Sequence, residues 1–168
     1  MAKNFRQELV GVFGYPVDEN PTVVIQDAAF EAKGLFWHYL TLLVKPEDLK
    51  DAMQSVRALN LAGINLTIPH KVACIPFLDK VDKSASLIGA VNTVKNDGGK
   101  LIGYNTDGQG FVWALREENV ALKDATIALL GAGGAARAIA AGSSALGCIW
   151  MTCLSRYQKL LKNYFIFP

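Results

Sequence analysis

Residues 125–154 read ATIALLGAGGAARAIAAGSSALGCIWMTCL, a glycine-rich turn between two apolar segments. The apolar runs on either side predict buried strands, and the small residues after the turn predict a helix. Gly131, Gly133 and Ala136 match the G-x-G-x-x-G/A spacing at the junction of strand and helix. Glycines there allow a tight turn and let helix-terminal N–H groups approach a pyrophosphate. The stretch predicts the start of a dinucleotide-binding domain, with cofactor contacts from Gly131, Ala132, Gly133, Gly134, Ala135 and Ala136. The alternative is a glycine turn that only connects two elements.

The residues after the second predicted strand bear on which dinucleotide is bound. NAD-specific domains place an acidic residue there, where it accepts hydrogen bonds from the ribose hydroxyls. Here Leu154 is followed by Ser155 and Arg156, and a hydroxyl beside a cation suits a 2′-phosphate. We therefore expect NADP, contacted by Ser155 and Arg156. NAD is the alternative, because an arginine at a strand end is commonly just solvated.

Upstream of this unit, strand and helix patterns alternate along the chain. The hairpin signature Asn-Asp-Gly-Gly lies in the middle of residues 90–105. The other predicted strands cover residues 8–16, 36–44 and 63–69, and the predicted helices cover 23–35, 46–60 and 106–117. In residues 46–60, an apolar stripe is formed by Leu49, Met53, Val56 and Leu59.

This alternation predicts an α/β protein. We expect a mostly parallel-sheet α/β domain over residues 1–105 and a connecting helix and linker over 106–123. An incomplete Rossmann-type βαβ domain is expected over 124–168.

Composition narrows the class of function. The chain has 168 residues, 51% of them hydrophobic and 19% charged, which predicts a compact fold with a sizeable core. Its net charge is only +2 and no basic stripe is present, so we expect no nucleic-acid partner. The three cysteines lack metal-ligand spacing, so we expect no metal site and a reducing, cytoplasmic environment.

Two segments test whether the protein reaches a membrane. The N-terminus MAKNFRQE has no apolar run behind its basic residues and does not look like a signal peptide. Residues 138–154 are uncharged, but Gly142, Ser143, Ser144 and Gly147 interrupt them. A helix followed by a buried strand fits better than a membrane span.

Short polar residues interrupt the apolar pattern at three predicted strand ends. The segments are GINLTIPHK at 63–71, GAVNTV at 89–94 and GYNTDGQG at 103–110. In this order, ahead of a GAGGAA turn, they resemble the shikimate dehydrogenase family over about residues 8–156. The resemblance implies an NADP-dependent oxidoreductase that reversibly reduces 3-dehydroshikimate to shikimate, on the chorismate route to aromatic amino acids.

The resemblance also implies roles for individual residues. Lys71 matches the catalytic lysine and Asp107 its partner carboxylate, and Thr67 and Asn92 match residues that bind substrate hydroxyls. Lys71 also follows a rigid proline near the start of a predicted helix, where the macrodipole disfavours a cation. Each role has an alternative. Lys71 could be an ordinary solvated lysine, and Asp107 or Thr106 could cap the next helix. Thr67 and Asn92 could make only local hydrogen bonds.

The first loop departs from the family pattern. Where the family has two serines that bind the substrate carboxylate, the segment GYPVDENPTVV at 14–24 places Asn20 and Thr22. Both can still hydrogen-bond a carboxylate, but Asp18 and Glu19 would repel an anion. Shikimate, quinate and an amino analogue therefore stay open as small-molecule substrates.

The end of the chain departs further. The family has a second mononucleotide half and closing helices, whereas this sequence ends soon after Arg156. We therefore expect a truncated form, a monomer or homodimer, with weak or absent turnover. The alternatives are a quinate/shikimate or aminoshikimate dehydrogenase using NAD, and a catalytically silent fragment that only binds shikimate-like acids.

Overall fold

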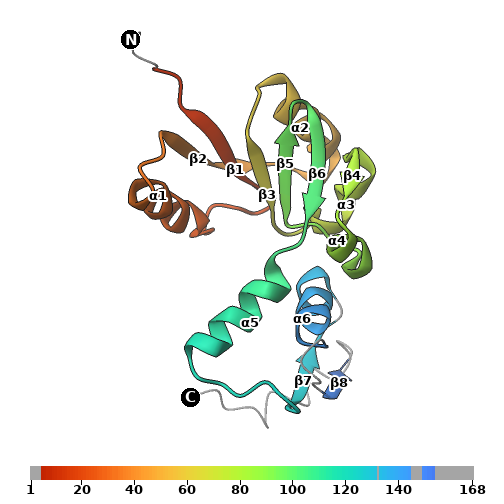
Figure 1. The fold of residues 1–168 in the computed structure, drawn as a ribbon. Coiled ribbons are helices and arrows are strands. Elements are labelled where there is room, and N and C mark those ends of the chain that lie inside the picture. Colours follow the sequence, from red (N-terminus) through yellow and green to blue (C-terminus); the bar gives the residue numbers. More distant parts are fainter. Residues whose placement is uncertain (1–4, 132, 145–148, 154–168) are drawn as a thin grey trace. The chain divides into compact units, whose positions relative to one another are not determined.

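The computed structural model describes residues 5–131, 133–144 and 149–153 (Figure 1). The chain divides into two compact units, Met1–Ser86 with Val91–Tyr104, and Leu87–Ala90 with Asn105–Pro168. Both contain strands and helices, so the predicted α/β class is confirmed. The three-part domain division stays a prediction, since compactness alone does not define domains.

The first unit is built on one six-stranded sheet. Its strand order is β2-β1-β3-β5-β6-β4. β1 runs parallel to β2 and β3, and β4 runs parallel to β6, whereas β5 is antiparallel to both of its neighbours. The sheet is therefore mixed, with three parallel and two antiparallel pairs of strands. The tight hairpin accounts for the antiparallel β5–β6 pair. The strands are β1 (Glu8–Gly14), β2 (Trp37–Leu43), β3 (Gly63–Leu66), β4 (Lys80–Val81), β5 (Thr93–Asp97) and β6 (Lys100–Tyr104).

The hairpin between β5 and β6 follows the predicted turn. Gly98 and Gly99 have φ values of 60° and 91°, the left-handed region that glycine adopts without strain. Asn96 accepts the Gly99 N–H at 2.8 Å and donates to the Leu61 carbonyl oxygen at 2.9 Å. The turn is thereby held against the chain that leads into β3.

Helices and short 3-10 turns connect the strands of the first unit. Leu49, Met53 and Val56 are buried, as the apolar stripe predicted. Leu59 is 66% exposed, so its place in that stripe was wrong: the helix ends at Ala58 and Leu59 caps it. The elements are α1 (Thr22–Ala32), η1 (Pro46–Asp48), α2 (Leu49–Ala58), α3 (His70–Ala73), η2 (Ile75–Phe77) and α4 (Lys83–Ile88).

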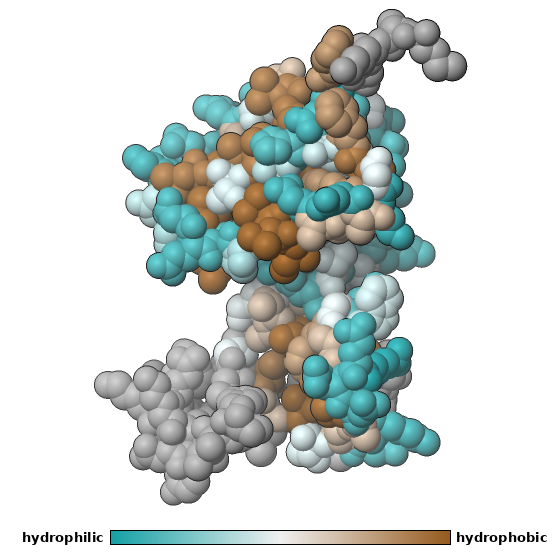
Figure 2. All heavy atoms as spheres, turned by 90° about the vertical axis from the view of Figure 1, so that its left-hand side faces the viewer, coloured by the Kyte–Doolittle hydropathy of each residue, from teal (hydrophilic) through white to brown (hydrophobic). Residues whose placement is uncertain are grey.

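Two hydrophobic clusters hold these helices to the sheet. The larger one includes Phe13, Met53, Leu66, Val94 and Leu101. The smaller cluster holds α1 through Phe30, packed with Val12, Val17 and Tyr39. Figure 2 views the side of this unit that carries α1 and β2, where hydrophobic clusters lie among hydrophilic side chains. The large hydrophobic residues of these two elements that are exposed are Val24, Ile25 and Leu43.

The second unit contains the predicted strand–helix–strand sequence. Its elements are α5 (Asp107–Glu117), β7 (Thr126–Leu130), α6 (Gly134–Ser144) and β8 (Ile149–Cys153). β7 and β8 pair in parallel, as a βαβ unit requires. Among the described helices, none is long and apolar enough to cross a membrane.

Two glycines bring α5 and α6 together. A Cβ on Gly142 would lie 2.6 Å from the Gly108 carbonyl oxygen, and one on Gly108 would collide with the Ala138 carbonyl oxygen. The helix backbones therefore approach more closely than any side chain would allow.

We predict that Gly108→Ala destabilises the second unit by about 1–3 kcal/mol, because the added methyl group forces the helices apart. Gly110→Ala is the matched control on the same helix, since its Cβ would meet nothing within 4 Å. It should instead stabilise α5 by about 0.5–1 kcal/mol. Hydrogen exchange of the α5 and α6 amides measures both effects. Equal protection in the two variants would contradict this packing.

Within the first unit, an ion pair between Arg57 and Asp79 joins α2 to the β5–β6 hairpin. The Arg57 guanidinium lies 2.8 Å from an Asp79 oxygen and donates to the Gly99 carbonyl oxygen at 2.9 Å. Asp79 also accepts the Leu101 N–H at 2.6 Å. That backbone bond and then Arg57 hold the pKa of Asp79 below its ordinary value of 3.8.

A lowered folded-state pKa stabilises the fold above the ordinary value, and this stabilisation is lost as the pH falls below 3.8. We therefore predict that Asp79→Asn is less stable than the parent chain at neutral pH and that the difference closes as the pH falls below 3.8. Urea unfolding across this range measures it. Asp27→Asn, at an exposed position of α1, should track the parent chain throughout. If the difference in unfolding free energy between Asp79→Asn and the parent chain stays constant with pH, the charge of Asp79 is not the cause of the difference.

Candidate active site

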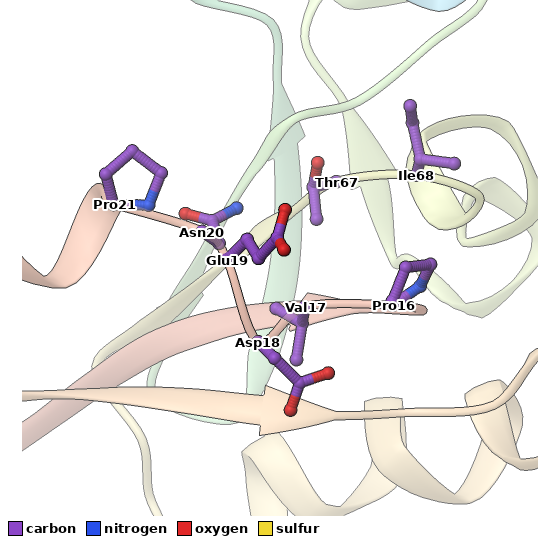
Figure 3. A pocket seen from close by; sticks show the side chains of 8 residues that line it. All are labelled: Pro16, Val17, Asp18, Glu19, Asn20, Pro21, Thr67 and Ile68. Atoms are coloured by element: carbon purple, nitrogen blue, oxygen red, sulfur yellow. The ribbon is translucent and has the colours of Figure 1, made fainter.

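A pocket lies where the loops after β1 and β3 meet (Figure 3). Its volume is about 540 Å³. The lining residues are Pro16, Val17, Asp18, Glu19, Asn20, Pro21, Thr67 and Ile68. The pocket thus forms at the carboxyl ends of two neighbouring parallel strands, the usual place for a ligand in an α/β sheet.

Backbone hydrogen bonds fix the two loops to each other. Thr67 donates its N–H to the Phe13 carbonyl oxygen at 3.0 Å, and Tyr15 donates to the Ile68 carbonyl oxygen at 2.9 Å. Between them, a Cβ on Gly14 would lie 2.5 Å from Cγ2 of Thr67. Glycine at position 14 is therefore what lets the Thr67 side chain occupy its place in the lining.

The first loop supplies polar and acidic groups to this pocket. Asn20 uses its Oδ1 to accept the Thr22 N–H at 3.0 Å, so it caps the start of α1 while it lines the pocket. Thr22 is the first residue of α1 and is not among the lining residues. Figure 3 shows Glu19 and Asn20 directed to the side of Thr67, whereas Asp18 points the opposite way. No lysine or arginine is among the lining residues, so the charge of the lining is negative.

Three of the predicted site residues converge at the end of β3. Lys71 accepts the Val91 N–H at its carbonyl oxygen at 2.7 Å, and Asn92 accepts the Leu66 N–H at 2.8 Å. Thr67 accepts the N–H of His70, the first residue of α3, at 2.8 Å. The structure therefore brings Thr67, Lys71 and Asn92 to one region of the first unit, although the chain separates them.

Lys71 is partly buried in α3, which has only four residues. So short a helix carries only a small macrodipole, and a cation at its start is disfavoured only weakly.

Asp107 is the first residue of α5 in the second unit. Its N–H donates to Oδ1 of Asn105 at 3.1 Å, and Asn105 donates in turn to the Ala90 carbonyl oxygen at 3.0 Å. Asn105 therefore supplies the capping group, and Thr106 at the N-cap position does not. Thr106 occupies the N-cap position that the sequence suggested, but its side chain makes no capping hydrogen bond. The pairing of Asp107 with Lys71 stays a prediction.

The glycine turn precedes α6 in the second unit. Gly131 has a φ of 111°, and apart from chain neighbours no described residue lies within 4 Å of a Cβ placed on Gly131 or Gly133. Gly133 accepts the Arg137 N–H at 3.0 Å as the helix begins. A glycine turn ahead of an eleven-residue helix is an arrangement that can bind a phosphate, and the cofactor contacts stay a prediction. Ala132, Ser155 and Arg156 lie outside the described residues, so the structure does not test them.

His70, next to Lys71, is a core residue. It is fully buried, its Nε2 lies 2.8 Å from the Val44 carbonyl oxygen, and Nδ1 has no partner among the described residues. His38 is exposed on the edge strand β2. Cys74 is also fully buried, and burial raises the pKa of its thiol to about 12, so it is unreactive.

Comparison with known proteins connects this arrangement to one family. Residues 12–94, which include both pocket loops, match the shikimate dehydrogenase substrate binding domain. The chain belongs to the shikimate dehydrogenase family.

Individual relatives agree with this membership. The NADP(+) shikimate dehydrogenase of Geobacillus sp. (strain WCH70) is 52% identical over 134 residues, which are 79% of this chain and 48% of that protein. The chain thus spans about half the length of the curated relatives it matches.

Solved structures match over similar lengths. The shikimate 5-dehydrogenase of Thermus thermophilus, in complex with NADP(H) and shikimate, superposes with a TM-score of 0.85 at 35% identity, over 93% of this chain and 59% of that one. The 5-ketofructose reductase of Gluconobacter sp. strain CHM43 reaches 0.80 at 42% identity, over 89% of this chain and 54% of that one.

Proposed function

We propose that this chain carries the substrate-binding part of an NADP-dependent shikimate dehydrogenase, which reversibly reduces 3-dehydroshikimate to shikimate. The observation that carries the proposal is the pocket at the ends of β1 and β3, inside the stretch that matches the family's substrate-binding domain. Thr67 lines this pocket, and backbone bonds hold the segments of Lys71 and Asn92 to the same part of the sheet.

The polar residues divide the substrate between them. Thr67 and Asn92 hydrogen-bond ring hydroxyls, and Asn20 in the pocket lining holds the carboxylate through a neutral donor. The Thr22 hydroxyl, at the start of α1 just beyond the lining, is the second proposed contact to the carboxylate. Lys71 Nζ gives a proton to the carbonyl oxygen during reduction and takes it back from the hydroxyl during oxidation. Asp107 orients the lysine and the reacting hydroxyl, the role that the family resemblance implies.

A nicotinamide dinucleotide, when bound, supplies the hydride for reduction. Its pyrophosphate would be held by the glycine turn before α6 and by the first helical turn of α6. These residues are Gly131, Gly133, Gly134, Ala135 and Ala136. NADP is the proposed cofactor because the matched relatives are named as NADP(+) enzymes. Ser155 and Arg156 are the proposed contacts to its 2′-phosphate.

One observation favours a second candidate, reduction of a neutral polyhydroxy ketone. Asp18 and Glu19 line the pocket without a basic residue beside them, and a carboxylate there would meet like charges. One structural relative, 42% identical, is named as a 5-ketofructose reductase. An uncharged ketose would avoid this repulsion. The two candidate substrates therefore differ in how their binding depends on the negative charge of the pocket.

If the ligand is an acid, removing a nearby negative charge should strengthen its binding. We predict that Glu19→Gln tightens shikimate binding about two- to fivefold at low salt, and that the gain fades as salt is added. Titration calorimetry with shikimate measures it. Glu31→Gln, an exposed position of α1, should leave the affinity unchanged. If Glu19→Gln does not bind shikimate more tightly, and the parent chain binds 5-ketofructose, the two results together would favour the ketose as substrate.

Lys71→Ala tests the reaction itself. We predict that it lowers the formation of reduced nicotinamide from shikimate and NADP by about 100-fold or more, because a positioned proton donor contributes that much. Shikimate affinity should change less than the rate, since Thr67 and Asn92 remain. Absorbance of the reduced nicotinamide measures the rate, and calorimetry measures the affinity.

Turnover that survives in Lys71→Ala would contradict the assigned role. A parent chain that binds shikimate without turnover would instead favour the silent binding fragment. A parent chain that neither binds nor oxidises shikimate would remove the proposed function.

A further inference from the structure

We propose that Tyr39 and Thr93 are positioning residues for Asn92, acting through Asn65, and that together they set which end of the Asn92 carboxamide meets the substrate. The proposal rests on the function proposed above, because it concerns a residue assigned to substrate binding. Its basis is a continuous chain of hydrogen bonds within the first unit.

The chain of hydrogen bonds runs across the sheet. The Tyr39 hydroxyl on β2 donates to Oδ1 of Asn65 on β3 at 2.8 Å, so it reaches across β1, which lies between these strands. Nδ2 of Asn65 donates to Oγ1 of Thr93 on β5 at 3.2 Å, and also to the Asn92 carbonyl oxygen at 3.3 Å. Oγ1 of Thr93 then donates to Oδ1 of Asn92 at 3.0 Å.

The direction of each bond follows from the one before it. A phenol that donates to Asn65 must meet the carbonyl oxygen of that carboxamide, which turns the NH₂ group towards Thr93. The Thr93 hydroxyl accepts one of these hydrogens, and its own single hydrogen is left for Asn92. Asn92 therefore turns its oxygen to Thr93, and its NH₂ group points elsewhere.

Burial makes this orientation costly to reverse. Tyr39 is 3% exposed and Asn92 is 9% exposed. Burial also raises the pKa of Tyr39, so the phenol keeps the proton it donates. A flipped Asn92 would place its NH₂ group against the Thr93 hydroxyl and break the sequence of donors and acceptors, and a buried unsatisfied group costs about 1–3 kcal/mol.

The consequence for binding is chemical selectivity. Asn92 follows directly on the segment that is bonded to Lys71, and it accepts the Leu66 N–H next to Thr67. With its NH₂ group directed away from Thr93, Asn92 offers a donor, which suits a hydroxyl or keto oxygen. Loss of the relay removes one of the bonds that hold this orientation, and part of the binding contribution of Asn92 is lost with it.

Isosteric variants test the relay. Thr93→Val and Tyr39→Phe each remove one hydroxyl with little change of shape. Thr93→Ser keeps the hydroxyl, and Thr41→Val makes the same threonine change at an exposed position of β2. We expect Thr93→Val and Tyr39→Phe to weaken shikimate binding about two- to tenfold, the worth of one hydrogen bond. Thr93→Ser and Thr41→Val should bind as the parent chain does.

Two further readouts separate positioning from a general loss of structure. The double variant Tyr39→Phe/Thr93→Val should lose less affinity than the product of the single losses, because both residues act through one chain of bonds. The side-chain NH₂ signals of Asn92 in the nuclear magnetic resonance spectrum of the ligand-free chain, assigned by their loss in Asn92→Ala, should shift in both single variants and stay in place in the two controls.

The relay is overturned if the Asn92 NH₂ signals do not move in Thr93→Val and Tyr39→Phe, or if the two losses of affinity simply multiply. A parent chain that fails to bind shikimate would count against the proposed function, and the Asn92 signals would still decide the relay.

Discussion

The pairing of β1 with β3 beyond their last strand residues is the constraint on which the pocket depends. Two backbone hydrogen bonds, from Thr67 to Phe13 and from Tyr15 to Ile68, carry the parallel register into the following loops. Since Gly14 has no side chain, the Thr67 side chain can fill the space above it. Loops joined in this way are positioned by the rigid sheet, so their side chains meet a ligand with little loss of conformational entropy.

The same strand ends connect the pocket to the other residues assigned to substrate. Lys71 and Asn92 are held by backbone bonds to Val91 and Leu66, which are both buried. His70 extends this network to the end of β2 through the Val44 carbonyl oxygen, and the Val44 N–H is bonded to Gly14. A displacement of any one of these strand ends would therefore move several assigned side chains at once.

The second unit uses glycine for two different physical reasons. At Gly131 and Gly133 the missing side chain leaves open space in front of a helix, which suits the approach of a phosphate. At Gly108 and Gly142 the missing side chains let two helix backbones touch. Gly142 stands among small residues just as Gly131 and Gly133 do, so the sequence does not separate the two roles. Only the surroundings of each Cβ position distinguish ligand access from packing.

The sequence by itself determined the order of the elements, the hairpin turn, the glycine fingerprint and the family, because each depends on residues near one another in the chain. Periodicity places Leu49, Met53 and Val56 on one helix face, and Asn-Asp-Gly-Gly specifies a tight turn locally. The tertiary structure alone decided that β5 pairs with β3 in the antiparallel direction, that Asn105 bonds the first N–H of α5, and that Tyr39 reaches Asn65 across β1. These features depend on strand pairing and on hydrogen bonds between distant segments, and such partners leave no local pattern, because a donor is chosen by proximity in the folded chain.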